Sequence, residues 1–201
     1  MKRIGIFGGT FNPIHNGHIQ MINACKDFAN LDRVIIIPSY TPPHKECDTL
    51  ENEEQRLEMC RIASMNMDFV EVSDVEIKRG GKSYTFETLQ FLKKMYPYDE
   101  LCFIMGADMF LTLEKWKNPE IIFKLATIIA VPRNSDDNNA LLKHYNNVLK
   151  DMGAKAEILN EPVLTVSSTY VRENIGNREI IKNLIDDKVY EFIRNNKLYR
   201  V

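Results

Sequence analysis

The chain alternates between two kinds of segment. Short apolar runs rich in β-branched residues are separated by longer stretches in which apolar residues recur with the period of a helix. We predict strands at 4–7, 34–37, 69–77, 101–105, 127–131 and, more weakly, 156–159. We predict helices at 17–28, 53–67, 85–95, 119–125 and 140–152. Fully apolar strands that alternate with helices indicate an α/β fold, a doubly wound parallel sheet with helices on both faces.

The length of 201 residues suits one ordinary domain. The sequence contains no internal repeat, low-complexity tract or interdomain linker. We therefore predict a single domain over 1–201, with 167–201 as a C-terminal subregion that is helical throughout. Within it, Asp186 and Asp187 are predicted to cap a final amphipathic helix that ends near Asn195. Either a place in the core or an interface between copies would account for that helix, so a homo-oligomer stays among the alternatives.

Charge and cysteine usage exclude several classes of protein. The 26 basic and 28 acidic residues leave a formal charge of -2, so no global field collects nucleic acid or an anionic membrane. The first apolar run stops at Gly8, which is too early for a signal peptide or a membrane span. Cys25, Cys47, Cys60 and Cys102 form no C-x-x-C pair and have no histidine at metal-ligand spacing. We expect a cytoplasmic protein with reduced cysteines and neither nucleic acid nor membrane as a partner.

Ligands of parallel sheets bind beyond the carboxyl ends of the strands, and the loop after the first strand carries unusual residues. It reads Gly8-Gly9-Thr10-Phe11-Asn12-Pro13-Ile14-His15-Asn16-Gly17-His18. The two glycines allow a sharp turn and let a phosphate approach main-chain N–H groups. His15 and His18 are three residues apart at the start of a helix, so both rings can project to one side. That helix end carries about +0.5 elementary charge, so we predict an anion site.

Other interpretations of the glycines exist. A lone Gly-Gly is also typical of a tight turn between strand and helix, with the histidines as ordinary surface residues. The run is not G-x-G-x-x-G, so the dinucleotide fingerprint of dehydrogenases is missing. Gly81-Lys82-Ser83 imitates the end of a Walker A loop, but Glu76 stands where the first glycine should be. Neither of these two nucleotide motifs is present.

A second candidate cradle comes late in the chain, at Ser167-Ser168-Thr169-Tyr170-Val171-Arg172. Hydroxyls and unpaired N–H groups at a helix start, with Arg172 one turn further on, favour a phosphate site. Taken alone, Ser-Ser-Thr is equally consistent with a plain helix cap.

Together the two segments resemble a known superfamily. G-G-T-F-x-P-x-H-x-G-H closely resembles the first signature of the nucleotidyltransferases that carry the H-x-G-H motif, and S-S-T-x-x-R resembles the second. Within that superfamily the chain is most similar to the bacterial nicotinate-nucleotide adenylyltransferases, from Gly5 to Tyr199. The segments that carry this similarity are Pro42-Pro43-His44-Lys45, Ser83-Tyr84-Thr85, Met105-Gly106-Ala107-Asp108 and Trp116. One departure is Asn12, where the family usually has Asp; Asn keeps the size and one acceptor, so we expect the loop to fold.

The resemblance implies a Rossmann-like nucleotidyltransferase fold and a transferase that moves the adenylyl group of ATP to nicotinate mononucleotide, giving deamido-NAD and pyrophosphate in NAD biosynthesis. It implies His15, His18 and Arg172 as catalytic residues. The ATP-binding residues that it implies are Gly8, Gly9, Thr10, Phe11, His15, His18, Gly106, Asp108, Ser167, Ser168, Thr169 and Arg172. The acceptor-binding residues are His44, Lys45, Tyr84, Thr85 and Trp116. Mg²⁺ is expected to bind through the ATP phosphates, without a dedicated protein metal site.

The chemistry of these residues agrees with the implied roles. His44 and Lys45 offer cationic donors to a phosphate or carboxylate, and N–H groups near Thr85 suit the nicotinate carboxylate. Trp116 suits stacking on the pyridine ring, worth roughly 1–3 kcal/mol, although packing against the following helix would also explain it. Asp108 either caps its own short helix or orients a ribose hydroxyl or metal-bound phosphates.

Three rivals remain open. Another member of the superfamily, such as a phosphopantetheine adenylyltransferase or a cytidylyltransferase, would share both cradles, but the acceptor segments favour nicotinate mononucleotide. A class I aminoacyl-tRNA synthetase is disfavoured because the chain lacks the K-M-S-K-S loop, an anticodon domain and excess basic charge. A non-catalytic adenine-nucleotide sensor would bind without turnover. Measuring pyrophosphate release with candidate acceptors separates the sensor from the enzymes.

Overall fold

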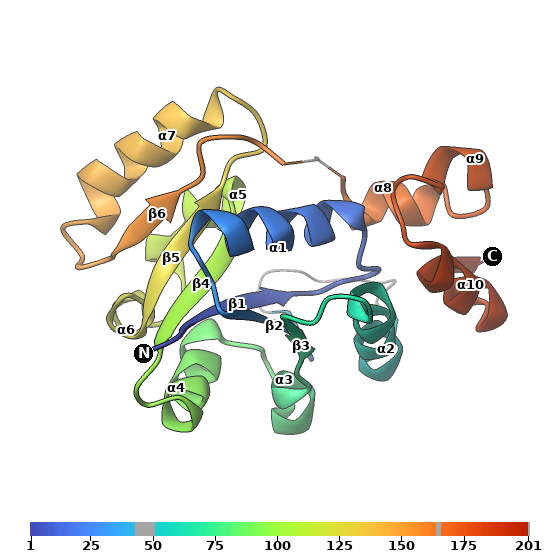
Figure 1. The fold of residues 1–201 in the computed structure, drawn as a ribbon, viewed down its shortest axis with the longest axis horizontal. Helices are drawn as coiled ribbons and strands as arrows, with labels where there is room; N and C mark the ends of the chain where they lie inside the picture. Colours follow the sequence, from blue (N-terminus) through green and yellow to red (C-terminus); the bar gives the residue numbers. More distant parts are fainter. Residues whose placement is uncertain (43–50, 164–165, 201) are drawn as a thin grey trace.

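The computed structural model describes residues 1–42, 51–163 and 166–200, and its centre is a six-stranded sheet in the order β3-β2-β1-β4-β5-β6. Every neighbouring pair of strands is parallel (Figure 1). The strands are β1 (Arg3–Gly9), β2 (Arg33–Pro38), β3 (Val70–Val72), β4 (Glu100–Gly106), β5 (Ala126–Val131) and β6 (Ala156–Ile158). The strand order reverses between β1 and β4, the place where such sheets bind ligands. The predicted doubly wound α/β fold is confirmed.

Helices cover both faces of the sheet. On one face lie α1 (Asn16–Phe28), α2 (Glu53–Ser64), α8 (Ser168–Glu173), α9 (Arg178–Ile181) and α10 (Asp187–Asn195). On the other lie α3 (Val75–Arg79), α4 (Thr85–Met95), α5 (Ala107–Phe110), η1 (Leu113–Lys115), α6 (Pro119–Leu125), α7 (Asp137–His144) and the π-helical turn η2 (Tyr145–Leu149). A short 3-10 segment, η3 (Leu198–Arg200), follows α10. Among the residues described, no helix combines the length and apolarity needed to cross a bilayer.

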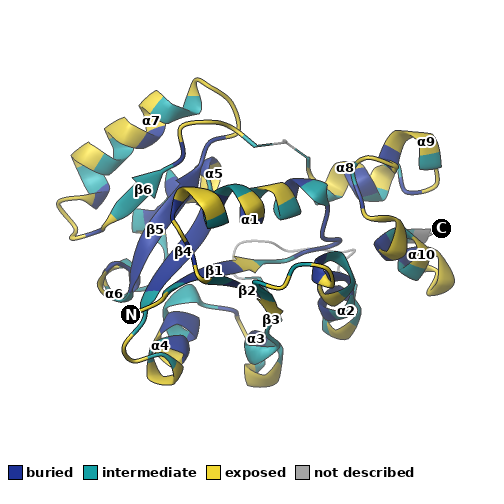
Figure 2. Ribbon diagram, viewed as in Figure 1, coloured by how far each residue is buried: buried dark blue, intermediate teal, exposed yellow. Residues whose placement is uncertain are grey.

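Each central strand is buried on both faces, which explains its unbroken apolar sequence (Figure 2). In β2, Val34 and Ile36 pack into the core beneath α1 and α2, while Ile35 and Ile37 pack into the core beneath α4 and α6. All four are at most 1% exposed. Successive side chains of a strand point to opposite faces, so a strand between two helical layers favours apolar side chains on both faces.

The predicted strand over 69–77 is wrong in its second half. β3 ends at Val72, and Val75 begins the helix α3. Two local interactions favour the helix over the β propensity of this stretch: Lys78 forms an ion pair with Asp74 at 3.0 Å, and the Lys78 amide donates to the Asp74 carbonyl. The chain therefore leaves the sheet five residues earlier than predicted, and Glu76 lies on a helix beside the sheet edge.

Three other helical predictions need correction. The tail is not helical throughout, because turns separate α8, α9 and α10. Asp186 caps α10, accepting from the amides of Lys188 and Val189, whereas Asp187 pairs with Arg178 instead of capping. The helix predicted over 140–152 also differs in its bounds, since α7 begins at Asp137 and η2 ends at Leu149.

The cysteines behave as packing residues where the structure describes them. Cys25, Cys60 and Cys102 are buried free thiols. Burial raises the pKa of the Cys25 and Cys102 thiols to about 12, so neither is ionised near neutral pH. Cys47 lies outside the described residues.

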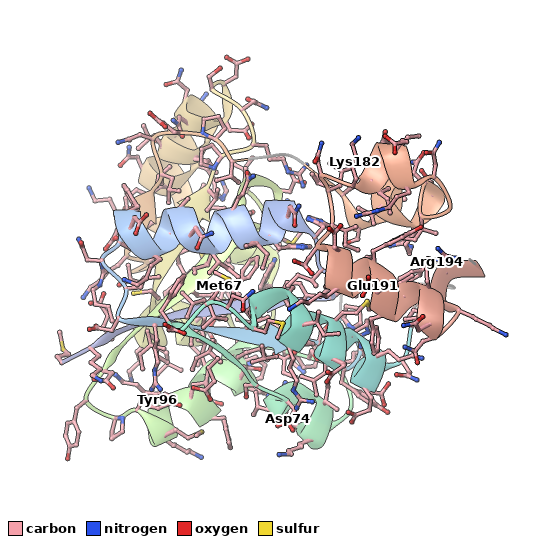
Figure 3. All side chains as sticks on the ribbon, turned by 45° about the vertical axis from the view of Figure 1, so that its right-hand side comes forward. Met67, Asp74, Tyr96, Lys182, Glu191 and Arg194 are labelled. Carbon is pink, nitrogen blue, oxygen red and sulfur yellow. The ribbon has the colours of Figure 1, made fainter. Side chains whose placement is uncertain are left out.

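The C-terminal subregion packs back onto the sheet domain. Ile181, Val189 and Ile193 are buried in the same core as α1 and α2, while Lys182, Glu191 and Arg194 are exposed along the tail (Figure 3). This placement supports our proposal that 1–201 is one domain with 167–201 as its helical subregion. Of the two alternatives for the amphipathic final helix, a place in the core or an interface between copies, the structure shows the first.

Tyr199 connects the end of the tail to the loop after β1. Its hydroxyl donates to Asn12 Oδ1 at 2.9 Å, and its amide donates to the Glu51 carboxylate at 3.0 Å. Asn12 is only 4% exposed, and its Oδ1 also accepts from the Glu51 amide at 3.3 Å. Asn12 is therefore a buried acceptor that holds the tail in place.

We predict that Tyr199→Phe lowers the free energy of unfolding by about 1–2 kcal/mol, because a buried acceptor loses a donor. Urea unfolding of the purified variant measures this. Tyr98→Phe is the matched control, since Tyr98 is 86% exposed and should change stability by less than about 0.5 kcal/mol. Equal effects of the two substitutions would contradict the role given to Tyr199.

Candidate active site

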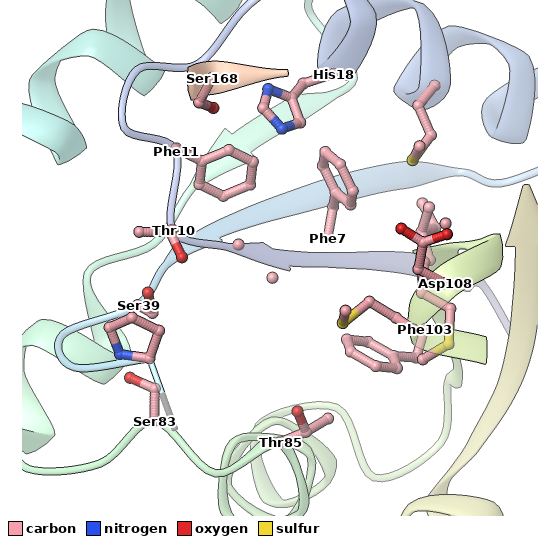
Figure 4. A pocket seen from close by; sticks show the side chains of 18 of the residues that line it. Phe7, Thr10, Phe11, His18, Ser39, Ser83, Thr85, Phe103, Asp108 and Ser168 are labelled. Carbon is pink, nitrogen blue, oxygen red and sulfur yellow. The ribbon is translucent and has the colours of Figure 1, made fainter. Parts of the chain in front are cut away.

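A cleft of about 470 Å³ opens beyond the carboxyl ends of β1, β2, β4 and β5. This is within the range of about 300–1,000 Å³ that is typical of small-molecule sites. Its walls come from the end of β1, the start of α1, the start of α4, the segment around Trp116 and the start of α8. In Figure 4, His18 and Ser168 lie on one side of the cleft, and Ser83 and Thr85 lie on the other. The cleft thus lies at the sheet edge that the sequence singled out.

Most of the predicted site residues line this cleft. They are Gly8, Gly9, Thr10, Phe11, His15, His18, Tyr84, Thr85, Gly106, Asp108, Trp116, Ser167 and Ser168. Thr169 and Arg172 lie next to it without lining it. His44 and Lys45 lie outside the described residues. The two predicted cradles, which are about 150 residues apart in the chain, therefore meet at one cleft.

The glycines at the end of β1 serve a different local purpose from the predicted sharp turn. Both are still part of β1, and the turn follows at Phe11, whose φ is 48°. A Cβ atom on Gly9 would lie 2.8 Å from Cζ of the buried Phe11 ring. A Cβ atom on Gly8 would lie 3.8 Å from its nearest neighbour, so the protein leaves the space beside Gly8 open. Gly9 is required by the packing of Phe11, and Gly8 leaves its backbone open to a ligand.

The two histidines are held in one orientation by reciprocal hydrogen bonds. The His15 amide donates to Nδ1 of His18 at 3.2 Å, and the His18 amide donates to Nδ1 of His15 at 3.4 Å. The rings stack with their centroids 3.6 Å apart. Because each Nδ1 is an acceptor, a neutral ring of either residue carries its proton on Nε2. Both rings can then act as N–H donors toward an anion in the cleft.

His15 stays neutral because it is buried. Removal from water lowers the pKa of its imidazole to about 4, outweighing the hydrogen bond that favours protonation. At neutral pH His15 is therefore a neutral N–H donor, not a fixed positive charge. The favourable potential for an anion at this point comes from the N-terminus of α1 and from the orientation of the N–H bonds.

Arg56, on α2, holds the backbone around the cleft. The side chain is fully buried, and its guanidinium donates to the carbonyls of Thr10 at 2.7 Å, Ser39 at 2.6 Å and Tyr40 at 3.2 Å. Nε donates to the Glu51 carbonyl at 3.0 Å. Thr10 follows β1, and Ser39 follows β2. One side chain therefore fixes the separation of the loops that follow these neighbouring strands.

Arg172 and Ser168 bind the same loop from the side of α8. Arg172 Nη1 donates to the Asn12 carbonyl at 2.8 Å, and the Ser168 hydroxyl donates to the Pro13 carbonyl at 2.9 Å. A second Arg172 nitrogen, Nη2, donates to the Thr169 hydroxyl at 3.2 Å. The residues of the second motif therefore connect it directly to the first. These bonds are the reason that the two segments form one site.

The opposite wall contains a carboxyl group that the sequence analysis did not single out for the site. Glu76 lines the cleft at 6% exposure, and its Oε1 accepts from the Thr88 hydroxyl at 2.5 Å. Burial raises the pKa of Glu76, while hydrogen bonds from Thr88 and Ser83 counteract that effect. The Ser83 hydroxyl also accepts from the Tyr40 amide at 2.9 Å. This network connects the loop after β2 to the start of α4, where Thr85 lies.

Trp116 and Lys117 occupy the same end of the cleft. The indole of Trp116 meets the Phe103 ring edge to face, with centroids 6.2 Å apart. Nζ of Lys117 lies 4.1 Å from the centroid of the Tyr84 ring. The family resemblance identified Trp116, whereas sequence reasoning missed Lys117, which had no signal beyond its position next to the tryptophan.

Asp108 forms an ion pair with Arg133, and both side chains line the cleft and are about half exposed. Arg133, which lies just after β5, was not predicted. No metal-binding cluster of three or more His, Cys, Asp or Glu side chains occurs in the ranges 1–42, 51–163 and 166–200.

Comparison with known proteins agrees with this site. A profile of the cytidylyltransferase-like family matches residues 6–174, which include both motifs. The chain is 38% identical over 200 residues to a protein of Clostridium tetani (strain Massachusetts / E88) described as "Probable nicotinate-nucleotide adenylyltransferase", and the match covers 100% of each chain. A protein of Clostridium novyi (strain NT) with the same description is 37% identical over 200 residues, again over 100% of both chains.

A solved structure shares the fold. The nicotinic acid mononucleotide adenylyltransferase of Plasmodium falciparum, complexed with NaAD, superposes with a TM-score of 0.80 at 19% sequence identity. The superposition covers 100% of this chain and 98% of the other. A structure of the same Plasmodium protein complexed with APC gives a TM-score of 0.79.

We predict that His15 makes stability depend on pH. Its folded pKa of about 4 lies below the ordinary histidine value of 6.5, so the unfolded chain takes up the proton first as the pH falls. The contribution of His15 to the free energy of unfolding is fully present above about pH 6.5 and is lost as the pH falls toward 4. At pH 4.5 the loss amounts to about 2–3 kcal/mol. His15→Asn, which keeps a helix-capping acceptor, should remove this dependence.

The measurement is urea unfolding of both proteins at pH 7.5 and pH 4.5. Between pH 7.5 and pH 4.5, the free energy of unfolding should fall more for wild type than for His15→Asn. Parallel pH dependences would show that His15 is not the titrating group.

We predict that Arg56→Met lowers the free energy of unfolding by about 3–5 kcal/mol, because buried carbonyls lose their donors. Arg61→Met, on the same helix, is the matched control, since Arg61 is half exposed and pairs with Glu58. Urea unfolding compares the two. A loss of less than about 1 kcal/mol at Arg56 would be inconsistent with its role in holding both loops.

Proposed function

Because the chain belongs to the cytidylyltransferase-like family and, within it, to the nicotinate-nucleotide adenylyltransferases, we propose that its cleft transfers the adenylyl group of ATP to nicotinate mononucleotide. The products are deamido-NAD and pyrophosphate, and the reaction is a step of NAD biosynthesis. The 5′-phosphate of the mononucleotide attacks the α-phosphorus of ATP, and the bond from that phosphorus to the bridging oxygen of the β-phosphate breaks. The released pyrophosphate carries the bridging oxygen away.

The observation that carries this proposal is the meeting of the two motifs. The histidines of the loop after β1 and the serines that begin α8 line one cleft, and Ser168 and Arg172 donate to carbonyls of the first loop. A triphosphate is long and highly charged, so it needs donors on more than one side. A cleft built from two helix N-termini supplies them without a net positive protein.

In this mechanism no protein group becomes covalently bonded to phosphorus. Transfer at phosphorus depends on positioning the reactants and stabilising the charge that develops on the transferred group. We assign the Nε2–H groups of His15 and His18 to the ATP phosphates and the bridging oxygen. Their reciprocal hydrogen bonds orient both rings before ATP binds, so little reorganisation is needed.

Arg172 acts at the β- and γ-phosphates in this proposal. Its bonds to Asn12 and Thr169 use only part of the hydrogen-bonding capacity of a guanidinium, and the remaining N–H groups suit phosphate oxygens. Gly8, Gly9 and Thr10 offer backbone donors along the triphosphate, and Gly106 and Asp108 border the adenosine. Thr169 supports Arg172 from within α8.

The acceptor binds at the opposite end of the cleft. We assign the nicotinate carboxylate to the N–H groups at the start of α4, near Tyr84 and Thr85, and the pyridine ring to Trp116. Tyr84, the N-cap residue of α4, makes no side-chain capping bond, so a carboxylate can take that place. His44 and Lys45 remain proposed ligands of the mononucleotide phosphate.

Mg²⁺ fits this cleft as an ion carried by ATP. Asp108 offers a carboxylate that is 52% exposed, which suits an ion that keeps most of its waters and binds chiefly to substrate phosphates. When bound, Mg²⁺ would neutralise part of the triphosphate charge. Asp108 would then hold water or a ribose hydroxyl at that point while Arg133 limits its motion.

We predict that wild-type protein with ATP and Mg²⁺ releases pyrophosphate only when nicotinate mononucleotide or a close analogue is added. His18→Ala should reduce kcat by about 10² to 10³-fold or more, as loss of one transition-state donor typically does. His144→Ala is the matched control, because His144 pairs with Glu114 outside the cleft. Thermal unfolding of each variant checks that folding is intact.

Two results would overturn the proposal. Release of pyrophosphate with none of the candidate acceptors would identify a nucleotide-binding sensor. Full activity of His18→Ala would remove the first motif from the mechanism.

A further inference from the structure

Lys117 places a positive charge at the acceptor end of the cleft. Its side chain is exposed and lines the cleft, and Nζ lies 4.1 Å from the centroid of the Tyr84 ring. Tyr84 is the N-cap residue of α4, and Thr85 is its first helical residue. Lys117 is therefore held beside the helix end that the proposed function assigns to the nicotinate carboxylate.

The face of the Tyr84 ring stabilises the ammonium group in this position. A cation over an aromatic face gains about 0.5–1 kcal/mol at an exposed site, which favours this rotamer over others. The start of α4 adds positive potential, because Tyr84 makes no side-chain capping bond there. An anion at this end of the cleft would meet both the ammonium group and the helix end.

The neighbouring acids do not neutralise Lys117. Glu76 accepts from Thr88 and lies 3.9 Å from Arg79, and Asp108 pairs with Arg133. None of the ion pairs among the described residues includes Lys117. The charge of the lysine is thus available to a ligand.

We propose that Lys117 is a specificity-determining residue that favours the mononucleotide with a ring carboxylate over the one with a ring carboxamide. This inference rests on the proposed function and adds to it the side chain that separates the two substrates. The acid and amide mononucleotides share the ribose, the phosphate and the pyridinium charge. They differ only in the ring substituent. A comparison of the two substrates therefore isolates the interaction between the positive charge and that substituent.

The size of the effect follows from the geometry. Attraction between unit charges about 4–6 Å apart, in a site partly screened by water, corresponds to about tenfold in affinity. The uncharged carboxamide gains almost none of this. Hydrogen bonds from the start of α4 are available to either substituent, because a carboxamide also has an acceptor oxygen.

The experiment measures kcat and KM for nicotinate mononucleotide and nicotinamide mononucleotide, with ATP and Mg²⁺, by pyrophosphate release. Wild type is compared with Lys117→Gln, Lys117→Arg and Lys115→Gln. Lys115 is the matched control, since it is exposed on the same segment but pairs with Glu114 and does not line the cleft.

Lys117→Gln should raise KM for the acid substrate about tenfold and leave kcat/KM for the amide within about twofold of wild type. Lys117→Arg should keep the preference for the acid, and Lys115→Gln should change neither substrate. The preference of wild type should also fall at high salt, since the attraction is partly screened.

Three outcomes would overturn the inference. An unchanged acid-to-amide ratio in Lys117→Gln, with wild type active, would reject the role of Lys117 and leave the proposed function standing. An equal loss for both substrates would show that Lys117 serves the shared phosphate or ring. Pyrophosphate release from wild type with neither substrate would reject the proposed function, and this inference with it.

Discussion

The loop between β1 and α1 exposes backbone carbonyls that neither the strand nor the helix can satisfy. Buried or partly buried carbonyls need donors, and here the donors come from distant parts of the chain. Arg56 binds Thr10, Arg172 binds Asn12, and Ser168 binds Pro13. The architecture around the cleft depends on these bonds, because they bring α2 and α8 to the same few residues.

This arrangement holds the loop from two sides. Arg56 binds it from α2, and Ser168 and Arg172 bind it from α8, so the backbone and the His15 and His18 rings face a ligand with few degrees of freedom left. Hydrogen bonds among Glu76, Thr88 and Ser83 fix the start of α4 on the other wall in a similar way. Donors held in this way stabilise developing charge more effectively than mobile ones.

Sequence alone predicted the layers of the fold, and most of the site residues that it predicted line the cleft. Unbroken apolar strands and the H-x-G-H and S-S-T-x-x-R segments carry strong local signals, and the bounds of α4 and α6 agree with the prediction. The hydrogen bonds that support the loop could not be predicted, since a bond from Arg56 to a carbonyl 46 residues away leaves no pattern in either segment. The strand predicted over 69–77 failed because side-chain contacts, not residue propensity, decide where β3 ends.

The connection between the two ends of the chain also has a consequence for the order of events during translation. Residues 8–18 leave the ribosome before Ser168, Arg172 and Tyr199, which bind that stretch and are made about 150 residues or more later. The nascent sheet can begin to assemble from its early strands, but the histidine loop lacks its full set of donors until the tail emerges. A partly synthesised chain would therefore acquire its architecture before it acquires a competent nucleotide site.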